Sequence, residues 1–321
     1  MVKKILITGG TGTTGRAVVK RLKDNYALTL LLPPGEPAAG LGVRNIVRGD
    51  ITRAHSLENL IEGYDTVIHM ACASGYRSWK DCLSINVDGS RNIIRKSVKA
   101  GVIRFIQMST VAVYGRVPGS TITENQPLKK INDPYGDTMI DAEHIVRRIS
   151  EKHRIDLTVF RPAEPLGTGD DKLLSRLMER LRSGYHRMID DGGNPASLVN
   201  AADVAEAVYL ALLKPESVAQ TYNIAAGKNP SWNEFVEEVC RGMDIPFAPK
   251  YISYKSAFRQ AVLSEFLSAF SNKPPGLNRY EVRLAGKSCS YSIRKAREEL
   301  GFEPSENLLG GIREDDIQRL Y

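Results

Sequence analysis

The sequence has few cysteines and no long apolar run, and each absence removes a class of protein. The four cysteines lie far apart and form no CxxC pair: Cys72, Cys82, Cys240 and Cys289. This spacing argues against a disulfide framework or a metal site and favours free thiols in a reduced compartment. No stretch provides the roughly 20 apolar residues that a membrane-spanning helix needs. The first residues lead directly into a strand pattern, so we expect no signal peptide and a cytoplasmic location.

The chain also lacks a block of charge of one sign. It carries 44 Lys and Arg against 37 Asp and Glu, which gives a formal net charge of +7. The basic residues within 91–99 and 147–154 recur at helical spacing, which is typical of a solvated helix face. We therefore expect no nucleic-acid partner, although a positive surface favours anionic phosphates. The length of 321 residues allows one large or two modest domains.

The stretch KILITGGTGTTGR, residues 4–16, organises the chain. An apolar run is followed by three glycines at three-residue spacing and then by an apolar helical pattern; the glycines are Gly9, Gly12 and Gly15. Strand, glycine-rich turn and helix are the context that dinucleotide binding requires. The first glycine permits the turn, the second lets the backbone approach a pyrophosphate, and the third lets the helix sit close to the strand. A glycine-rich turn without a ligand is the alternative, and the flanking elements favour a cofactor.

Further apolar segments predict a doubly wound parallel sheet of the α/β class. Strands are expected at 28–32, 43–47, 66–69, 103–108 and 155–160, with helices at 81–100 and from Pro134. More helices are expected in the second half at 172–182, 204–213, 232–242, 256–270 and 292–300. The segment 256–270, rich in Phe, Leu and Ala, is interpreted as a core helix, an apolar lid or a surface resting on a membrane.

The strand ends hold the candidate binding residues. The second strand runs into two prolines and a glycine, so the usual acid for NAD or arginine for NADP does not stand there. Asp50 either accepts from the adenine amino group or caps the helix that starts near Ser56. After the fourth strand, small residues would let the backbone pass the cofactor. Tyr76 and Trp79 in the next loop are candidates for a substrate wall.

Taken in order, these motifs resemble the extended short-chain dehydrogenase/reductase family, the group of NAD-dependent epimerases, dehydratases and 3β-hydroxysteroid-dehydrogenase-like enzymes. The matching segments are TGGTGTTG (8–15), Asp50-Ile51, His69-Met70-Ala71, Asn86-Val87, Ser109-Thr110, Val113-Tyr114-Gly115, Pro134-Tyr135-Gly136, Arg161-Pro162, Asp203-Val204-Ala205 and AREELGFEP (296–304). The resemblance implies an NAD(P)-binding Rossmann domain at 1–165, to which 198–213 returns, and a smaller C-terminal substrate domain at 166–321. It also implies a homodimer.

The resemblance assigns roles residue by residue. Tyr135 would be the general acid/base, Thr110 would hold the substrate oxygen, and Asn86 would sit in the proton-relay position. The cofactor would be NAD(P), with NAD preferred, and no metal is implied. The implied cofactor contacts are Gly9, Gly12, Thr13, Thr14, Gly15, Asp50, Ile51, Met70, Ala71, Tyr135 and Pro162.

The chain departs from the family at Met139, where the family has a lysine four residues after the tyrosine. A cation about 4–5 Å from the phenol at an effective dielectric of about 20 contributes roughly 3–4 kcal/mol. This energy lowers the pKa of the tyrosine by about 2–3 units. Without it, three interpretations stand: an enzyme that does not depend on the lysine, a catalytically silent NAD(P)-binding sensor or partner protein, or an engineered inactive variant of a nucleotide-sugar epimerase.

We expect redox chemistry at a secondary alcohol or ketone, on its own or within an epimerase (isomerase) or dehydratase cycle. The apolar surface predicted at 254–270 favours a mid-sized substrate with an apolar part. A nucleotide sugar is the second candidate, with Arg259, Arg279 and Arg283 as the basic residues available for a diphosphate.

Overall fold

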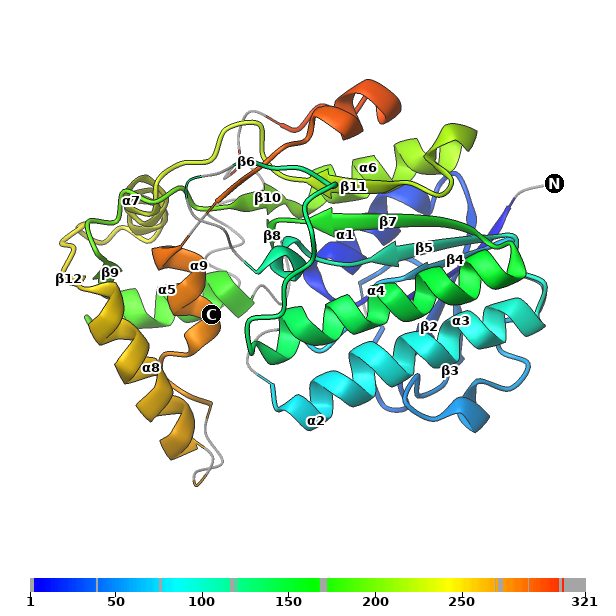
Figure 1. The fold of residues 1–321 in the computed structure, drawn as a ribbon, viewed down its shortest axis with the longest axis horizontal. Coiled ribbons are helices and arrows are strands. Elements are labelled where there is room, and N and C mark those ends of the chain that lie inside the picture. The colour runs from blue at the N-terminus through cyan, green and yellow to red at the C-terminus, as the bar shows by residue number, and fades with distance from the viewer. Residues whose placement is uncertain are drawn as a thin grey trace.

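The computed structural model describes residues 3–38, 40–74, 77–115, 119, 121–167, 172–268, 270, 274–287, 289–305 and 308. Within these residues the centre is a seven-stranded sheet in the order β11–β7–β5–β4–β1–β2–β3 (Figure 1). The strands are β1 (Lys4–Thr8), β2 (Ala27–Leu32), β3 (Asn45–Arg48), β4 (Thr66–His69), β5 (Arg104–Met108), β7 (Asp156–Pro162) and β11 (Thr221–Ile224). All neighbours pair in parallel, which confirms the predicted doubly wound sheet.

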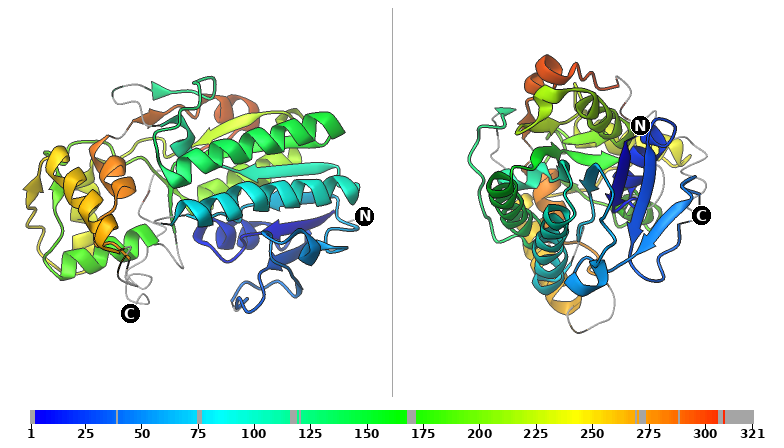
Figure 2. Two further views of the ribbon diagram at one scale, coloured as in Figure 1. Left: turned by 60° about the horizontal axis from the view of Figure 1, so that its bottom comes forward. Right: turned by 90° about the vertical axis from the view of Figure 1, so that its right-hand side faces the viewer.

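Helices cover both faces of the sheet, as a parallel sheet requires. Figure 2 shows α3 (Ser90–Lys99) and α4 (Pro134–His153) side by side on one face. The other face carries α1 (Thr13–Leu22) and α6 (Ala201–Leu213), which pack against each other. Both layers are amphipathic, and their apolar sides meet the continuous apolar runs of the strands.

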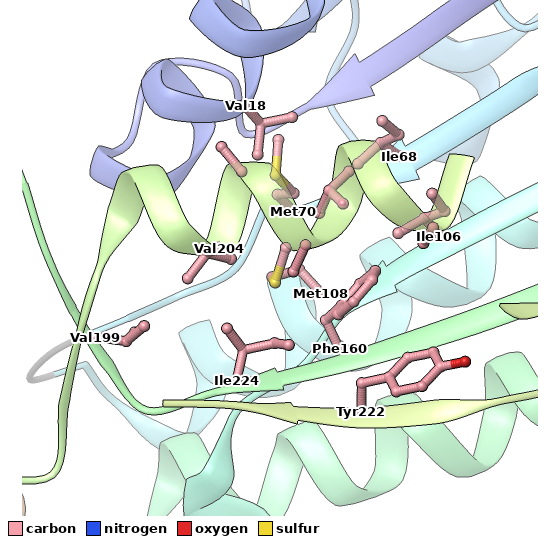
Figure 3. Packing of buried hydrophobic residues seen from close by; sticks show 14 of the residues in the cluster. Val18, Ile68, Met70, Ile106, Met108, Phe160, Val199, Val204, Tyr222 and Ile224 are labelled. Carbon is pink, nitrogen blue, oxygen red and sulfur yellow. The ribbon is translucent and has the colours of Figure 1, made fainter. Parts of the chain in front are cut away.

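The larger apolar cluster lies between the sheet and the α1–α6 layer (Figure 3). Val18 of α1 and Val204 of α6 are fully buried against Ile68, Ile106 and Phe160 of the central strands. Each such side chain contributes about 1.5–3 kcal/mol when it leaves water. This packing fixes the strand ends that carry the candidate site.

The predicted helix at 81–100 is interrupted. The structure has α2 (Trp79–Cys82), a π-helical stretch (Leu83–Gly89) and then α3. Asn86 lies inside the π-helical stretch, where one extra residue per turn turns its amide inward. Such local widening is frequent at functional sites.

The second half builds a smaller layer at one end of the sheet, on the left in Figure 1. It contains α5 (Lys172–Arg182), β9 (Met188–Ile189), α7 (Trp232–Gly242), β12 (Tyr251–Ile252), α8 (Tyr254–Ser268) and α9 (Arg279–Gly286). Short parallel pairs join distant segments: β8 (Glu164–Leu166) with β10 (Leu198–Asn200), and β6 (Thr121–Ile122) with β13 (Ser290–Tyr291). In the part of the chain that the structure describes, no helix is long and apolar enough to cross a membrane.

Candidate active site

The glycine-rich turn lies between β1 and α1. A Cβ on Gly9 would lie 2.5 Å from the amide nitrogen of Ala71, and a Cβ on Gly15 would lie 2.0 Å from the carbonyl oxygen of Gly9. Backbone packing therefore requires glycine at both positions. A Cβ on Gly12 would meet only the Gly9 carbonyl oxygen, at 3.8 Å. The space in front of Gly12 is open for a ligand.

The N-terminus of α1 fits a phosphate group. Gly12 is the N-cap residue, makes no side-chain cap, and is followed by a first turn without acidic residues. The backbone N–H groups at Thr13 and Thr14 and the helix dipole therefore favour an anion in front of Gly12. Open space in front of a helix N-terminus suits the pyrophosphate of a dinucleotide.

The ends of β1 and β4 are joined by a buried polar group. The hydroxyl of Thr8 lies 2.6 Å from Nδ1 of His69 and accepts from the amide of Ala71 at 3.2 Å. Nε2 of His69 lies 3.0 Å from the hydroxyl of Ser90. Burial lowers the pKa of His69 to about 4, so the ring is neutral at neutral pH. These hydrogen bonds fix the backbone at Met70 and Ala71 beside the glycine-rich turn. The turn follows β1, which lies between β4 and β2 in the sheet.

A carboxylate reaches the turn from the loop after β2. The hydroxyl of Thr11 donates to Glu36, four residues beyond the end of that strand. Sequence reasoning missed Glu36 because the two prolines and the glycine before it gave no sign that the loop folds back. An acid beside this turn is positioned to bind a ribose hydroxyl.

Asp50 makes its hydrogen bonds within its own turn. Its carboxylate accepts from the amide of Thr52 at 2.9 Å and from the Thr52 hydroxyl at 2.8 Å. The short helix Ala54–Leu57 has Arg53 at its N-cap, so the alternative that Asp50 caps this helix is wrong. The side chain of Ile51 packs against Gly89, where a Cβ would lie 2.8 Å from it.

Tyr135 meets Thr110 and Cys72 near the carboxyl end of β5. Thr110 is held by its own turn, since its hydroxyl accepts from the amide of Ala112 at 3.1 Å. The Tyr135 side chain lies near both Thr110 and Cys72, which act on its pKa in opposite directions. Burial, together with the Cys72 thiol and the carboxylate of Glu164, raises the pKa of Tyr135 well above its usual value. The phenol is therefore protonated at neutral pH.

Met139 lies one helical turn after Tyr135 and is buried. Only 2% of its surface is exposed, and it belongs to the same apolar cluster as Met108 and Phe160. The side chain one turn after Tyr135 is therefore a thioether packed in the core.

Asn86 bridges two segments beside the tyrosine. Its side-chain carbonyl accepts from the amide of Ala73 at 2.7 Å, and its amide group donates to the hydroxyl of Thr138 at 2.9 Å. The Thr138 hydroxyl in turn donates to the carbonyl of Pro134 at 2.5 Å. Asn86 therefore ties the loop after β4 to the first turn of α4.

Two further groups near Tyr135 were not predicted from the sequence, one on α9 and one on β8. The ring of Tyr280 on α9 meets the ring of Tyr135 edge-on, with centroids 6.0 Å apart. The Tyr280 hydroxyl donates to the carboxylate of Glu164 on β8. No motif marked either residue, because only the fold brings α9 and β8 to the start of α4.

The remaining sequence candidates are spread out. Trp79 is 40% exposed at the start of α2. Tyr76 lies outside the described residues. Pro162 ends β7 and pairs with Ile224 of β11.

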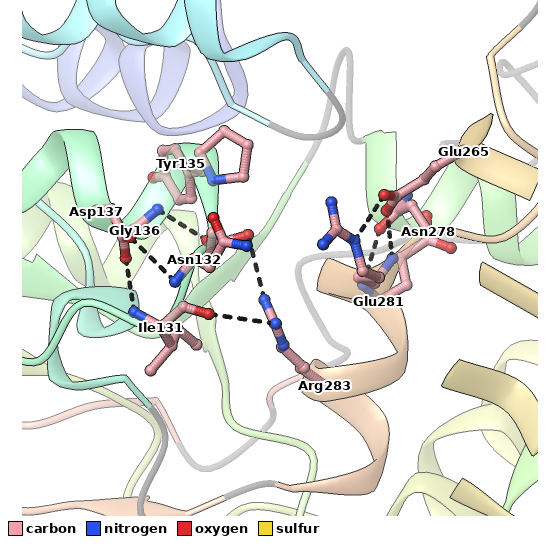
Figure 4. A network of polar contacts seen from close by, with 12 residues as sticks. Ile131, Asn132, Tyr135, Gly136, Asp137, Glu265, Asn278, Glu281 and Arg283 are labelled. Carbon is pink, nitrogen blue, oxygen red and sulfur yellow. Dashed lines mark hydrogen bonds and ion pairs between the residues drawn. The ribbon is translucent and has the colours of Figure 1, made fainter. Parts of the chain in front are cut away.

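An arginine joins α9 to the start of α4 (Figure 4). Arg283 donates to the carbonyl of Ile131 at 3.3 Å and lies 3.9 Å from the carboxylate of Asp133. Asp133 also caps α4 by accepting from the amide of Gly136 at 2.8 Å. The contact holds the smaller layer against the helix that carries Tyr135.

A cavity of about 580 Å³ lies inside the smaller layer. Residues of α5, β9, α8 and α9 contribute to its lining, and Tyr135 does not. Among the described residues no cluster of His, Cys, Asp or Glu suits a metal ion.

Known proteins resemble the whole chain. The chain is 29% identical to a 2-alkyl-3-oxoalkanoate reductase of Stenotrophomonas maltophilia, with 97% of each chain covered. It is 29% identical to short-chain dehydrogenase/reductase family 42E member 1 of Danio rerio, over 93% of this chain and 84% of that protein. Its fold matches a UDP-glucuronic acid 4-epimerase from Bacillus cereus in complex with NAD, with a TM-score of 0.79, 19% identity and 99% of each chain covered.

The family model described as the NAD dependent epimerase/dehydratase family matches residues 5–225, which include the glycine-rich turn, Thr110 and Tyr135. This match covers more than half of the chain and agrees with the parallel sheet and its glycine-rich turn. The chain therefore belongs to the NAD dependent epimerase/dehydratase family, within the extended short-chain dehydrogenase/reductase enzymes.

Proposed function

We propose that this protein is an NAD(P)-dependent oxidoreductase that reduces a ketone to a secondary alcohol, with Tyr135 as the proton donor. The observation that carries the proposal is the placement of a protonated Tyr135 side chain near Thr110, one helical turn before a buried Met139. A phenol without a neighbouring ammonium is a poor base at neutral pH but stays available as an acid.

Each residue of the candidate active site has a separate role in this reduction. When bound, the reduced nicotinamide supplies the hydride that the carbonyl carbon accepts. Thr110 holds the carbonyl oxygen by a hydrogen bond, and Tyr135 transfers its proton to that oxygen as the negative charge develops. Tyr135 then regains a proton from solvent. Asn86 acts through Thr138 by fixing the first turn of α4, which makes it a positioning residue.

NAD is the preferred cofactor in this proposal. The carboxylate of Glu36 beside Thr11 suits the two ribose hydroxyls of the adenosine, and it repels a 2′-phosphate. The pyrophosphate would lie at Gly12, Thr13 and Thr14. The NAD complex of the Bacillus cereus epimerase supports this choice.

Relatives support the direction of the reaction. The relative from Stenotrophomonas maltophilia is named as a reductase of 3-oxo acids, whose reacting group is a ketone. An epimerase or dehydratase cycle would need the tyrosine to accept a proton from an alcohol first, and the raised pKa of Tyr135 opposes that step. The homodimer and the cytoplasmic location stay predictions from the resemblance and the composition.

A catalytically silent NAD(P)-binding protein is the second candidate, and Met139 is the observation that favours it. The two are separated by a panel of ketones and secondary alcohols incubated with NADH or NADPH, with dinucleotide binding measured by calorimetry in parallel. Reduction of a ketone supports the enzyme. Tight binding without turnover in either direction supports the silent protein, and no binding contradicts both.

A further inference from the structure

We propose that α8, together with Phe270 just beyond its end, binds the surface of an anionic lipid bilayer. This inference does not depend on the proposed function. Large apolar side chains near the C-terminal end of α8 are 46–78% exposed: Val262, Leu263, Phe266, Leu267 and Phe270. With the exposed Lys255 and Arg259 they form the outward face of the helix. This exposure shows that the interpretation of 256–270 as a core helix is wrong.

The helix α8 places small apolar side chains inward and large ones outward. Ala257 and Ala261 are fully buried and belong to a small apolar cluster with Ile189 of β9 and Val282 of α9. A helix that serves only the core of its own protein has the opposite arrangement, because burying Leu or Phe removes more apolar surface from water than burying Ala. The large side chains of α8 therefore indicate a contact outside the fold.

The exposed residues follow one side of the helix. Lys255, Arg259, Val262 and Phe266 succeed one another at three- or four-residue spacing, which makes them neighbours on a helix surface. The rings of Phe266 and Phe270 also meet, with centroids 5.1 Å apart. Figure 1 shows α8 at the edge of the smaller layer, with its C-terminal end at the periphery of the molecule. The apolar half of the outward face can therefore reach a flat surface.

The charges on this face suit anionic headgroups. Lys255 and Arg259 are exposed in the first half of α8. The single acidic residue of the helix, Glu265, has a side chain that is only 12% exposed and binds Arg279 at 2.7 Å. The outward face thus combines cations with hydrocarbon. Cations are attracted to an anionic membrane surface, and apolar side chains beside them insert below the headgroups.

The size of the apolar surface favours a bilayer over a second protein chain. At these exposures the five apolar side chains offer on the order of 500 Å². A stable protein–protein interface buries roughly 800 Å² of each partner. A groove of about 430 Å³ beside the helix extends the surface, and its lining by α8 and residues 274–277 contains no charged side chain. Lipid adapts to such a surface without a matching shape.

Binding is tested by flotation of the full chain with two kinds of vesicle, pure phosphatidylcholine and an equimolar mixture of phosphatidylcholine and phosphatidylglycerol. The double variant Phe266→Ser, Phe270→Ser removes apolar surface, and Arg259→Glu reverses one charge of the face. Leu213→Ser, 55% exposed at the end of α6, and Arg294→Glu, with an 81% exposed side chain, are matched controls on other surfaces. All five side chains are exposed, so each variant is expected to fold.

The proposal predicts that the parent floats with the mixed vesicles and binds pure phosphatidylcholine at least fivefold more weakly. Binding to the mixed vesicles should weaken at least tenfold in the double variant, since two phenyl groups no longer leave water. It should weaken about fivefold or more in the Arg259→Glu variant, and both controls should bind as the parent does.

Three results would overturn the proposal. The first is a parent that does not bind the mixed vesicles, and the second is a loss of binding in the two controls equal to that in the α8 variants. The third is a dimer, measured by light scattering, that the double variant converts to a monomer while the parent ignores both kinds of vesicle. In that case the outward face of α8 binds a second copy of the chain.

Discussion

Met139 follows Tyr135 by one turn of α4, and its side chain lies in the apolar core with 2% of its surface exposed. The resemblance to the family implies that these are the positions at which it pairs a tyrosine with a lysine. Here the tyrosine side chain is partly buried and lies near Thr110 and Cys72. The resting phenol is therefore protonated, which is the state from which it can donate a proton.

The Met139→Lys variant tests this interpretation through pH. Reduction needs the neutral phenol, so the activity of the parent is present at neutral pH and is lost only as the pH rises through the raised pKa of Tyr135. An ammonium one turn away lowers this pKa by about 2–3 units, so the alkaline loss of reduction begins at a correspondingly lower pH. The pH profile of kcat gives the answer, with the volume-conserving Met139→Leu variant as the control. Coincident profiles of Met139→Lys and parent would contradict the account.

Gly12 is predicted to serve the ligand rather than the fold. Because a Cβ there meets only the Gly9 carbonyl oxygen at 3.8 Å, the Gly12→Ala variant should keep the thermal midpoint of the parent within a few degrees. The added methyl group occupies the space of the pyrophosphate, so the affinity for NADH should fall about tenfold or more. Calorimetry measures the thermal midpoint and the NADH affinity of the Gly12→Ala variant. The Gly227→Ala variant is the control, with its glycine away from the turn. Unchanged NADH affinity in Gly12→Ala would remove the pyrophosphate from this position.

Glu36 is predicted to set the cofactor preference. The parent should bind NADH about tenfold or more tightly than NADPH, since a 2′-phosphate beside the carboxylate is repelled. In the Glu36→Ala variant this ratio should shrink, while Glu62→Ala, exposed elsewhere on the surface, should retain it. Binding of all four dinucleotides is titrated for each protein. A parent that prefers NADPH would show that Glu36 does not lie at the ribose.

The apolar pattern and the glycine spacing of the sequence were sufficient to predict the parallel sheet and the glycine-rich turn. Continuous apolar runs such as 28–32 are unambiguous in a parallel sheet, and glycines at fixed spacing have a single backbone explanation. The interruption of the helix at 83–89 was not visible, because a π-helical stretch changes the register without changing the composition.

The residues that surround Tyr135 and the glycine-rich turn from distant segments could not be predicted in the same way. Glu164 and Tyr280 are 116 residues apart and meet only through the packing of α9 on the Rossmann half. Glu36 reaches Thr11 through a loop whose path depends on long-range contacts. Local patterns identify elements, whereas these pairs depend on how the elements are brought together.

A buried ion pair supports the end of β7 behind the site. Arg161 and Glu143 are 5% and 1% exposed in their side chains, and their closest atoms are 2.7 Å apart. Glu143→Ala leaves a buried guanidinium without this partner and should lower the free energy of unfolding by about 3–5 kcal/mol. The double variant Glu143→Leu, Arg161→Met should cost less than the sum of its single changes. Urea denaturation measures the free energy of unfolding of each variant. If the losses of the single variants add up to the loss of the double variant, the two side chains do not act as a pair.

The most direct test of the central claim compares the parent with Tyr135→Phe in the reduction of a ketone by NADH. The account predicts a fall in kcat of about 10²–10⁴-fold, typical of losing a general acid, with NADH still bound and the thermal midpoint unchanged. The Tyr280→Phe variant, which keeps the ring against Tyr135, should retain most of the activity. A Tyr135→Phe variant as active as the parent would contradict the assignment of Tyr135 as the proton donor.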